Sequence, residues 1–364
     1  MLLGGVITDL FEWRWVFLIN VPVALLTLAA VPRIVRESRP AARPGFDLAG
    51  AAAVTGALTI FVYGILETGS NGWLSHKTTG LLAAAAALLL VFVAVEQRSS
   101  APLVPARLVR RRTTIAANAI QYAVAASLIS SFFLLTLYLQ QVLGYSPLRA
   151  GLSYVPLAAM FALAMGSAGK LAPLVGVRPL IAGGLVISAV GLVLFAHLPV
   201  EGNYLTDVLP ALLLMALGGG WALVSVTMAA LAKVEESAAG LASGLLNSSG
   251  QLGGAVGVAV LAAIATNRGA DALASGATPL TAQVEGFRLA FLIAAAISLA
   301  GALVAALALE RLKPGGPPLP ATPAPTETEE HEIEHIHPTA EMPNAWDDAE
   351  EWEEQYAQPA RETA

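Results

Sequence analysis

Long apolar runs, separated by short polar clusters, dominate the first 313 residues of the chain. A helix needs about 20 mostly apolar residues to cross a bilayer, with some tolerance for tilt. Alanine, leucine, valine and glycine recur in these runs without the two-residue alternation of a β-barrel, so the runs are predicted to be α-helices. The pattern therefore predicts an all-α, polytopic membrane protein of about nine transmembrane helices. The nine segments are Val16–Pro32, Leu48–Leu66, Thr78–Val95, Thr114–Leu139, Leu148–Ala168, Pro179–His197, Thr206–Ala230, Leu241–Ala265 and Leu289–Leu309.

Composition favours membrane helices over the alternative, a set of buried helices in a water-soluble protein. Hydrophobic residues make up 56% of the chain and charged residues 13%, and the mean hydropathy is +0.68. Soluble domains carry about 25% charged residues. The chain has no cysteine, which excludes disulfides and thiolate metal sites.

Basic residues are distributed unevenly if successive loops alternate between the two sides of the membrane. The positive-inside rule places the richer side, and with it the C-terminus, in the cytoplasm of a multi-pass plasma-membrane protein. Fourteen basic residues fall on this side: Arg33, Arg36, Arg39, Arg43, Arg98, Arg107, Arg110, Arg111, Arg112, Lys170, Arg178, Lys233, Arg311 and Lys313. The other side holds five, namely Arg14, Lys77, Arg149, Arg268 and Arg288.

From Pro314 onward the sequence is rich in proline, glutamate and threonine, which predicts a disordered, acidic cytoplasmic tail over residues 314–364. The tail includes an H-E-x-x-H motif at His331, Glu332 and His335, followed by His337. A zinc peptidase holds this motif on a helix of a folded domain, so the tail is not predicted to be catalytic. Weak adventitious metal binding stays open. The sequence indicates no enzyme, no cofactor, no specific metal site and no nucleic-acid partner.

A motif near the start of the chain combines two glycines with the pattern W-R-W-x-F-x-I-N-x-P. It comprises Gly4, Gly5, Trp13, Arg14, Trp15, Phe17, Ile19, Asn20 and Pro22. The stretches GYSPLRAGLSYVPLA, GLASGLLNSSGQLGGAVGVAVLAAIA and GFRLAFLIAAA follow later in the chain. With these motifs, most of Met1–Lys313 resembles the fourteen-span drug:proton antiporters of the major facilitator superfamily.

The resemblance implies a division of the chain into four parts. Residues 1–46 would be the end of an N-terminal half, with a partial span, one complete span and a cytoplasmic loop. Residues 47–112 would be two inserted linker spans and a basic loop, residues 113–313 a six-helix C-terminal half, and residues 314–364 the tail. On this alignment the chain is expected to be truncated at its N-terminus.

Polar residues within the predicted spans are the candidates for a substrate pathway, because a buried amide in lipid is costly unless it is paired. Asn118 and Gln121 lie three residues apart, Asn247 and Gln251 four apart, and Trp221 follows three glycines. Gly240 and Gly244 begin the glycine stripe on which Asn247 and Gln251 lie. For all of these residues, helix packing is the alternative role.

The resemblance implies export of small lipophilic or cationic compounds by alternating access, coupled to protons. The partners would be the substrate, the lipid bilayer and protons, with a missing N-terminal half as a further partner if the chain is a half-subunit. The proton-coupling residue is unknown, because Asp47, Glu67 and Asp207 all fall at predicted helix ends. It is expected in the missing helices. The alternative is a non-transporting fragment, or a half-subunit that requires a separate N-terminal half.

Overall fold

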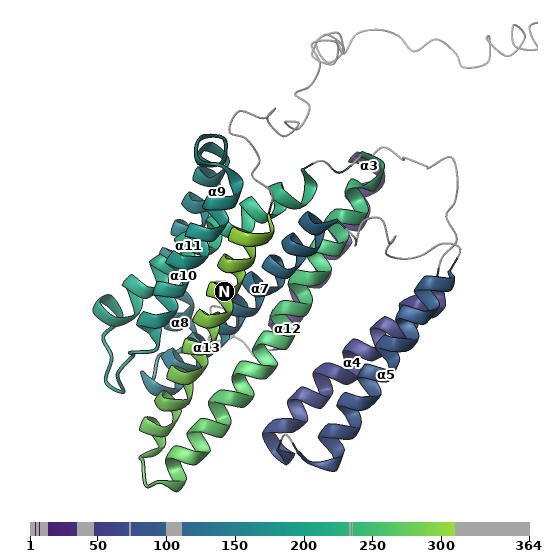
Figure 1. The fold of residues 1–364 in the computed structure, drawn as a ribbon. Coiled ribbons are helices and arrows are strands. Elements are labelled where there is room, and N and C mark those ends of the chain that lie inside the picture. Colours follow the sequence, from purple (N-terminus) through teal and green to yellow (C-terminus); the bar gives the residue numbers. More distant parts are fainter. Residues whose placement is uncertain are drawn as a thin grey trace, which may run out of the picture. The chain divides into compact units, whose positions relative to one another are not determined.

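The computed structural model describes residues 4, 7, 14–34, 47–72, 74–99, 111–232, 234 and 236–309, and within these ranges every regular element is helical (Figure 1). Eight helical segments of the described ranges are long and apolar enough to cross a membrane. They match the second to ninth predicted spans and confirm the all-α polytopic fold. The main helices are α4 (Leu48–Asn71), α5 (His76–Arg98), α7 (Arg112–Leu137), α8 (Pro147–Leu152), α9 (Val155–Val175), α10 (Val177–Phe195), α11 (Leu209–Leu231), α12 (Glu236–Ala274) and α13 (Pro279–Ala308).

The first predicted span, Val16–Pro32, is divided into two helices, α2 (Trp15–Leu18) and α3 (Asn20–Ile34). The interruption is at Ile19, where the Asn20 side chain donates a hydrogen bond to the Phe17 carbonyl at 3.4 Å. Pro22 has no N–H and so cannot donate to a carbonyl of the preceding turn. It therefore lies in the first turn of α3, where a missing donor costs little.

Helices α4 and α5 form an antiparallel hairpin (Figure 1). The Asp47 side chain accepts a 2.7 Å hydrogen bond from the Gly50 N–H and so caps the start of α4. Gly72 ends α4 with a positive φ of 78°, a conformation that glycine adopts without strain. Glu67 and Lys77 join the two helices by a 2.8 Å salt bridge beside the turn.

Helices α7 to α13 form a bundle whose contacts follow a repeated plan (Figure 1). Helix α7 packs on α12 and α13, and α11 packs on α9 and α10. If α7 is exchanged for α11, α9 for α12 and α10 for α13, these contacts between helices stay the same. This is the relation expected of two repeats of three helices. The core runs through the whole bundle and includes the fully buried Tyr138, Phe195 and Phe291.

Helix α11 approaches three neighbours at one glycine triplet. A Cβ at Gly218 would overlap the Gly184 carbonyl oxygen of α10. A Cβ at Gly219 would lie 2.8 Å from a Leu128 methyl of α7, and one at Gly220 would lie 2.6 Å from the Ala164 Cβ of α9. Each glycine of the triplet therefore allows a different helix to approach closely, as small residues do in membrane bundles.

Helices α12 and α13 are longer than the apolar segments that predicted them. Helix α12 continues to Ala274 and is followed by Gly276, whose φ is 94°; α13 begins at Pro279 behind a Thr278 cap. Polar residues in these extensions hid them from a search for apolar runs. Arg268 and Glu285 form a 2.8 Å salt bridge between the two extensions.

Arginines satisfy backbone carbonyls at both ends of the bundle. Arg112 donates to the Leu307 carbonyl at 2.9 Å and Arg178 donates to the Ala306 carbonyl, so both bind the last turn of α13. At the opposite end Arg288 donates twice to the Leu198 carbonyl, at 3.2 and 3.0 Å. Arg112 and Arg178 thus share one end and Arg288 lies at the other, in agreement with the alternation used to count the loops.

We expect a single methyl group at Gly218 to destabilise the bundle. The Gly218→Ala variant should lose about 1–3 kcal/mol of unfolding free energy, because the methyl group meets backbone that cannot move aside. Thermal unfolding of the purified chain in detergent would measure the loss. Gly240→Ala is the matched control, since a Cβ there has nothing within 4 Å and alanine is the better helix former. Equal melting temperatures for the two variants would refute this account.

Candidate functional site

Asn118 of α7 lies at the contact with α12. Its amide nitrogen donates to the Thr114 carbonyl at 2.9 Å, and its oxygen accepts a hydrogen bond from the Ser249 hydroxyl of α12 at 2.7 Å. Both polar ends of this amide are therefore satisfied, one within α7 and one across to α12. A paired amide of this kind can hold two membrane helices in register.

Gln121, one turn further along α7, is half-buried beside Gly250 of α12. A Cβ at Gly250 would lie 2.8 Å from the Gln121 amide nitrogen, so glycine at this position leaves room for the side chain as it lies here. The Gln121 Oε1 atom is buried and accepts no hydrogen bond from the described residues. A buried carbonyl oxygen without a donor is costly, which makes Gln121 a candidate to accept a hydrogen bond from a ligand.

Helix α12 has two different faces. Gly253 and Gly257 meet the α7 backbone at Tyr122 and Ala126. The face that carries Gly240, Gly244, Asn247 and Gln251 is exposed, and a Cβ at either of the first two glycines would have nothing within 4 Å. The glycine stripe of α12 is thus divided between a packed face and an open one.

Asn247 and Gln251 share the open face of α12. Two amides on the exposed side of a membrane helix are poorly suited to contact with hydrocarbon, so this face is better suited to a polar cavity or another protein segment. Neither amide is next to Asn118 on the packed α7–α12 contact. The structure therefore places the four predicted amides on two surfaces rather than in one cluster.

Trp221 lies at the contact between α11 and α9. The side chain is half-buried, and its indole N–H donates to the Ser167 hydroxyl of α9 at 2.9 Å. Leu171 and Met228 belong to the same cluster. Sequence reasoning identified Trp221 but missed Ser167 and Ser249, the hydroxyl partners of Trp221 and Asn118. No spacing rule singles out one serine among many; only the pairing of helices identifies them.

The remaining predicted residues belong to the first 22 residues of the chain and to its tail. Asn20 and Pro22 are exposed at the start of α3, Arg14 and Trp15 are exposed at the start of α2, and Gly4 is helical. Gly5, Trp13 and the H-E-x-x-H motif lie outside the described residues. Among the residues that the structure does describe, no group of three acidic, histidine or cysteine side chains is arranged to hold a metal.

Four carboxylates of the described residues take part in hydrogen bonds or salt bridges near helix ends. Asp47 caps α4, Glu67 pairs with Lys77, and Glu285 pairs with Arg268. Asp207 accepts a 2.7 Å hydrogen bond from the Asn203 N–H. These carboxylates hold local structure rather than standing alone in the middle of a span.

The Asn118–Ser249 hydrogen bond should be measurable by a double-mutant cycle. We expect Asn118→Ala and Ser249→Ala to destabilise the chain non-additively, with a coupling energy of about 0.5–1.5 kcal/mol. Chemical or thermal unfolding in detergent would provide the four values. Thr59→Ala is the control partner, because the Thr59 hydroxyl bonds within its own helix to the Thr55 carbonyl. Additive effects of Asn118→Ala and Ser249→Ala would mean that the pair does not couple α7 to α12.

Known proteins give an independent view of this helical bundle. The sequence profile of the Major Facilitator Superfamily matches residues 1–258. The lincomycin resistance protein of Streptomyces lincolnensis is 38% identical over 263 residues, which are 72% of this chain and 54% of that protein. The puromycin resistance protein pur8 of Streptomyces alboniger is 34% identical over 312 residues, or 84% and 61% of the two chains.

A multidrug resistance protein B homolog of Mycobacterium tuberculosis is 30% identical over 268 residues, covering 73% of this chain and 50% of that protein. The chain thus spans about half the length of the curated relatives that it matches. The profile covers more than half of the chain, and the structure supplies the expected membrane-length helices. The chain is a multi-pass membrane protein and belongs to the major facilitator superfamily.

Proposed function

We propose that the chain works in the export of small lipophilic or cationic compounds across the plasma membrane, by alternating access and coupled to inward movement of protons. The observation that carries the proposal is the open face of α12, where Asn247 and Gln251 are exposed on a helix of membrane length. The names of the relatives support it, since they are resistance proteins for lincomycin, puromycin or multiple drugs.

The side chains near these surfaces suit substrates of mixed character. Amide groups both donate and accept hydrogen bonds, and an indole ring attracts cations through its π face. Long aliphatic side chains cover much of the exposed surface, for example Leu163 and Leu174 of α9 at 68% and 73% exposure. Sites for drug-sized molecules combine such apolar walls with a few polar groups.

The acidic residue that carries protons is expected outside the described residues of this chain. Proton carriers in membrane transporters are typically acidic residues within a span. The described carboxylates lie near helix ends, where caps and salt bridges engage Asp47, Glu67 and Glu285. A further segment that supplies the acid would belong to the same transport unit.

The second candidate is a non-transporting fragment or half-subunit that requires a separate N-terminal half. The exposed faces of α9 and α12 favour it, because a transporter half buries such a face against its counterpart. Transport by the chain alone separates the two candidates.

Efflux of a fluorescent lipophilic cation from cells that express the chain tests the transport proposal. If the chain transports alone, efflux should stop when a protonophore collapses the proton gradient, and a carboxylate near a helix end must then carry the proton. Replacing Asn247 and Gln251 together by alanine should raise the KM for the cation roughly tenfold, because each amide hydrogen bond contributes about 0.5–1.5 kcal/mol. Thr59→Ala, a polar change on α4, should leave the KM unchanged. A membrane-inserted chain without efflux would favour the half-subunit, and co-expression with an N-terminal half should then restore transport.

The position of the C-terminus can be measured directly. A C-terminal fusion to a fluorescent protein should fluoresce, and a fusion to a periplasmic phosphatase should be inactive, because the basic ends of the spans are expected to stay in the cytoplasm. Fusions placed after Gly202, in the segment between α10 and α11, should give the opposite pair of results. Phosphatase activity at the C-terminus would reverse the orientation proposed for the whole chain.

A further inference from the structure

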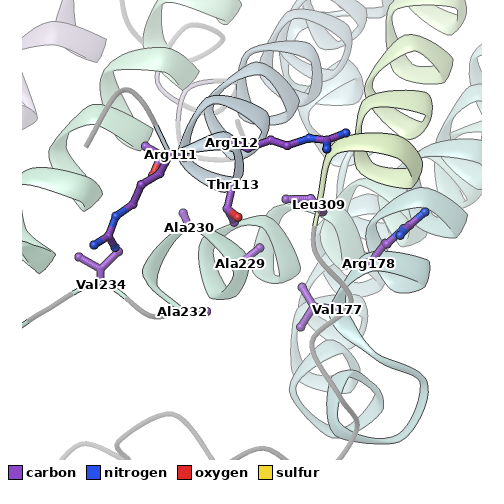
Figure 2. A pocket seen from close by; sticks show the side chains of 11 residues that line it. Arg111, Arg112, Thr113, Val177, Arg178, Ala229, Ala230, Ala232, Val234 and Leu309 are labelled. Atoms are coloured by element: carbon purple, nitrogen blue, oxygen red, sulfur yellow. The ribbon is translucent and has the colours of Figure 1, made fainter. Parts of the chain in front are cut away.

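A basic cavity lies where four helices end (Figure 2). It has a volume of about 410 Å³ and is lined by residues at the starts of α7 and α10 and at the ends of α11 and α13. Arg111 and Arg178 lie on opposite sides of it, and the Thr113 hydroxyl points toward it. Small aliphatic side chains, including Ala229 and Ala230, form one wall.

The charged residues described in the lining of this cavity have one sign. They are three arginines, Arg111, Arg112 and Arg178, and no acidic residue is among the described lining residues. Arg112 and Arg178 each donate to a carbonyl of α13. Because a guanidinium group carries five N–H donors in a planar fork, most donors of these two side chains are left to bind a second acceptor. Arg111 is exposed at the rim.

Two long helices begin at the cavity without a side-chain cap. Arg111 is the N-cap residue of α7 and Gly176 that of α10, and neither donates nor accepts a side-chain capping hydrogen bond. The first backbone N–H groups of a helix lack partners within the helix, and the helix dipole is positive at this end. These N–H groups add to the arginines and favour an oxyanion at the cavity.

The position of the cavity at the ends of the membrane-length segments indicates which kind of anion would bind there. Arg112 and Val177 are the first residues of two membrane-length segments, and Leu231 and Ala308 are the last residues of two others. The ends of spans lie at the boundary between hydrocarbon and headgroups, where the phosphates of lipids are found. The aliphatic wall lies next to the basic groups. A ligand that carries acyl chains on glycerol needs such an apolar surface beside the site of its charged group.

We propose that this cavity binds the headgroup of an anionic phospholipid. The arginines take the phosphate, for which their planar forks are suited, and the aliphatic wall contacts the glycerol and the first acyl carbons. Because Arg112 and Arg178 also hold α13, the lipid joins the ends of α7, α10 and α13. The lining of this site includes none of the four amides, and the site does not depend on the proposed transport activity.

Titration of the purified full chain in detergent with short-chain lipids tests the site. Phosphatidylglycerol should bind at least tenfold more tightly than phosphatidylcholine, whose phosphate is neutralised by its own choline, and added salt should weaken its binding. The Arg111→Gln variant should weaken phosphatidylglycerol binding roughly fivefold. The Thr113→Val variant should also weaken phosphatidylglycerol binding, although it leaves the charge of the cavity unchanged. Equal affinity for the two lipids would overturn the proposal.

Arg149→Gln is the matched control, because Arg149 is an exposed arginine at the opposite end of the α7 span. Its Cζ atom lies 3.8 Å from the centroid of the Tyr145 ring. This variant should bind phosphatidylglycerol as the unchanged chain does; an equal loss in Arg149→Gln would show unspecific charge attraction and refute the site. Melting temperatures verify that each variant is folded. If Arg111→Gln unfolds, Arg178→Lys replaces it as the test variant, because lysine keeps the positive charge but lacks the planar guanidinium group. Inorganic phosphate at millimolar concentration should not displace the lipid; displacement would identify a site for free anions instead.

Discussion

Close packing at the glycines of α11 is the constraint on which the bundle depends. Within a bilayer, lipid tails are as apolar as leucine side chains, so helices gain little from hiding leucine and must gain from close packing and hydrogen bonds. Gly218, Gly219 and Gly220 provide this contact toward α10, α7 and α9, respectively. Trp221 follows the triplet directly, so the same packing fixes where its indole meets Ser167.

Helix α12 shows how one sequence pattern serves two roles. On one face, Gly253 and Gly257 allow α12 to touch the α7 backbone, and the Asn118–Ser249 hydrogen bond fixes the register of that contact. On the other face, Gly240, Gly244, Asn247 and Gln251 remain exposed. The packed face belongs to the architecture of the bundle. The proposal of transport rests on the open face.

Charged residues act mainly at the ends of the helices. Arg112 and Arg178 bind the last carbonyls of α13, and Arg288 binds the Leu198 carbonyl at the other end. An arginine at a helix end keeps its charge near water while its donors satisfy backbone groups that lack partners in the helix. This arrangement gathers positive charge around the cavity between α7, α10, α11 and α13. The proposed lipid site is thus a consequence of how the helix ends are satisfied.

The sequence by itself determined the class of fold and most of the spans. Apolar runs of membrane length predict helices because unpaired backbone groups are intolerable in lipid, and this requirement depends on no tertiary contact. The prediction was least accurate where helices extend beyond the apolar run, as α12 and α13 do around Arg268 and Glu285. Their polar residues form a salt bridge between the two helices, which a hydropathy pattern does not register.

Only the tertiary structure decided what each polar residue in a span contacts. Asn118 and Asn247 look equivalent in the sequence, since each belongs to an amide pair on a helix, yet one bonds Ser249 and the other faces outward. The same holds for the glycines of α12, of which Gly253 is packed and Gly240 is open. Helical periodicity fixes which residues share a face. Which face meets another helix depends on packing between segments more than a hundred residues apart, as Asn118 and Ser249 are.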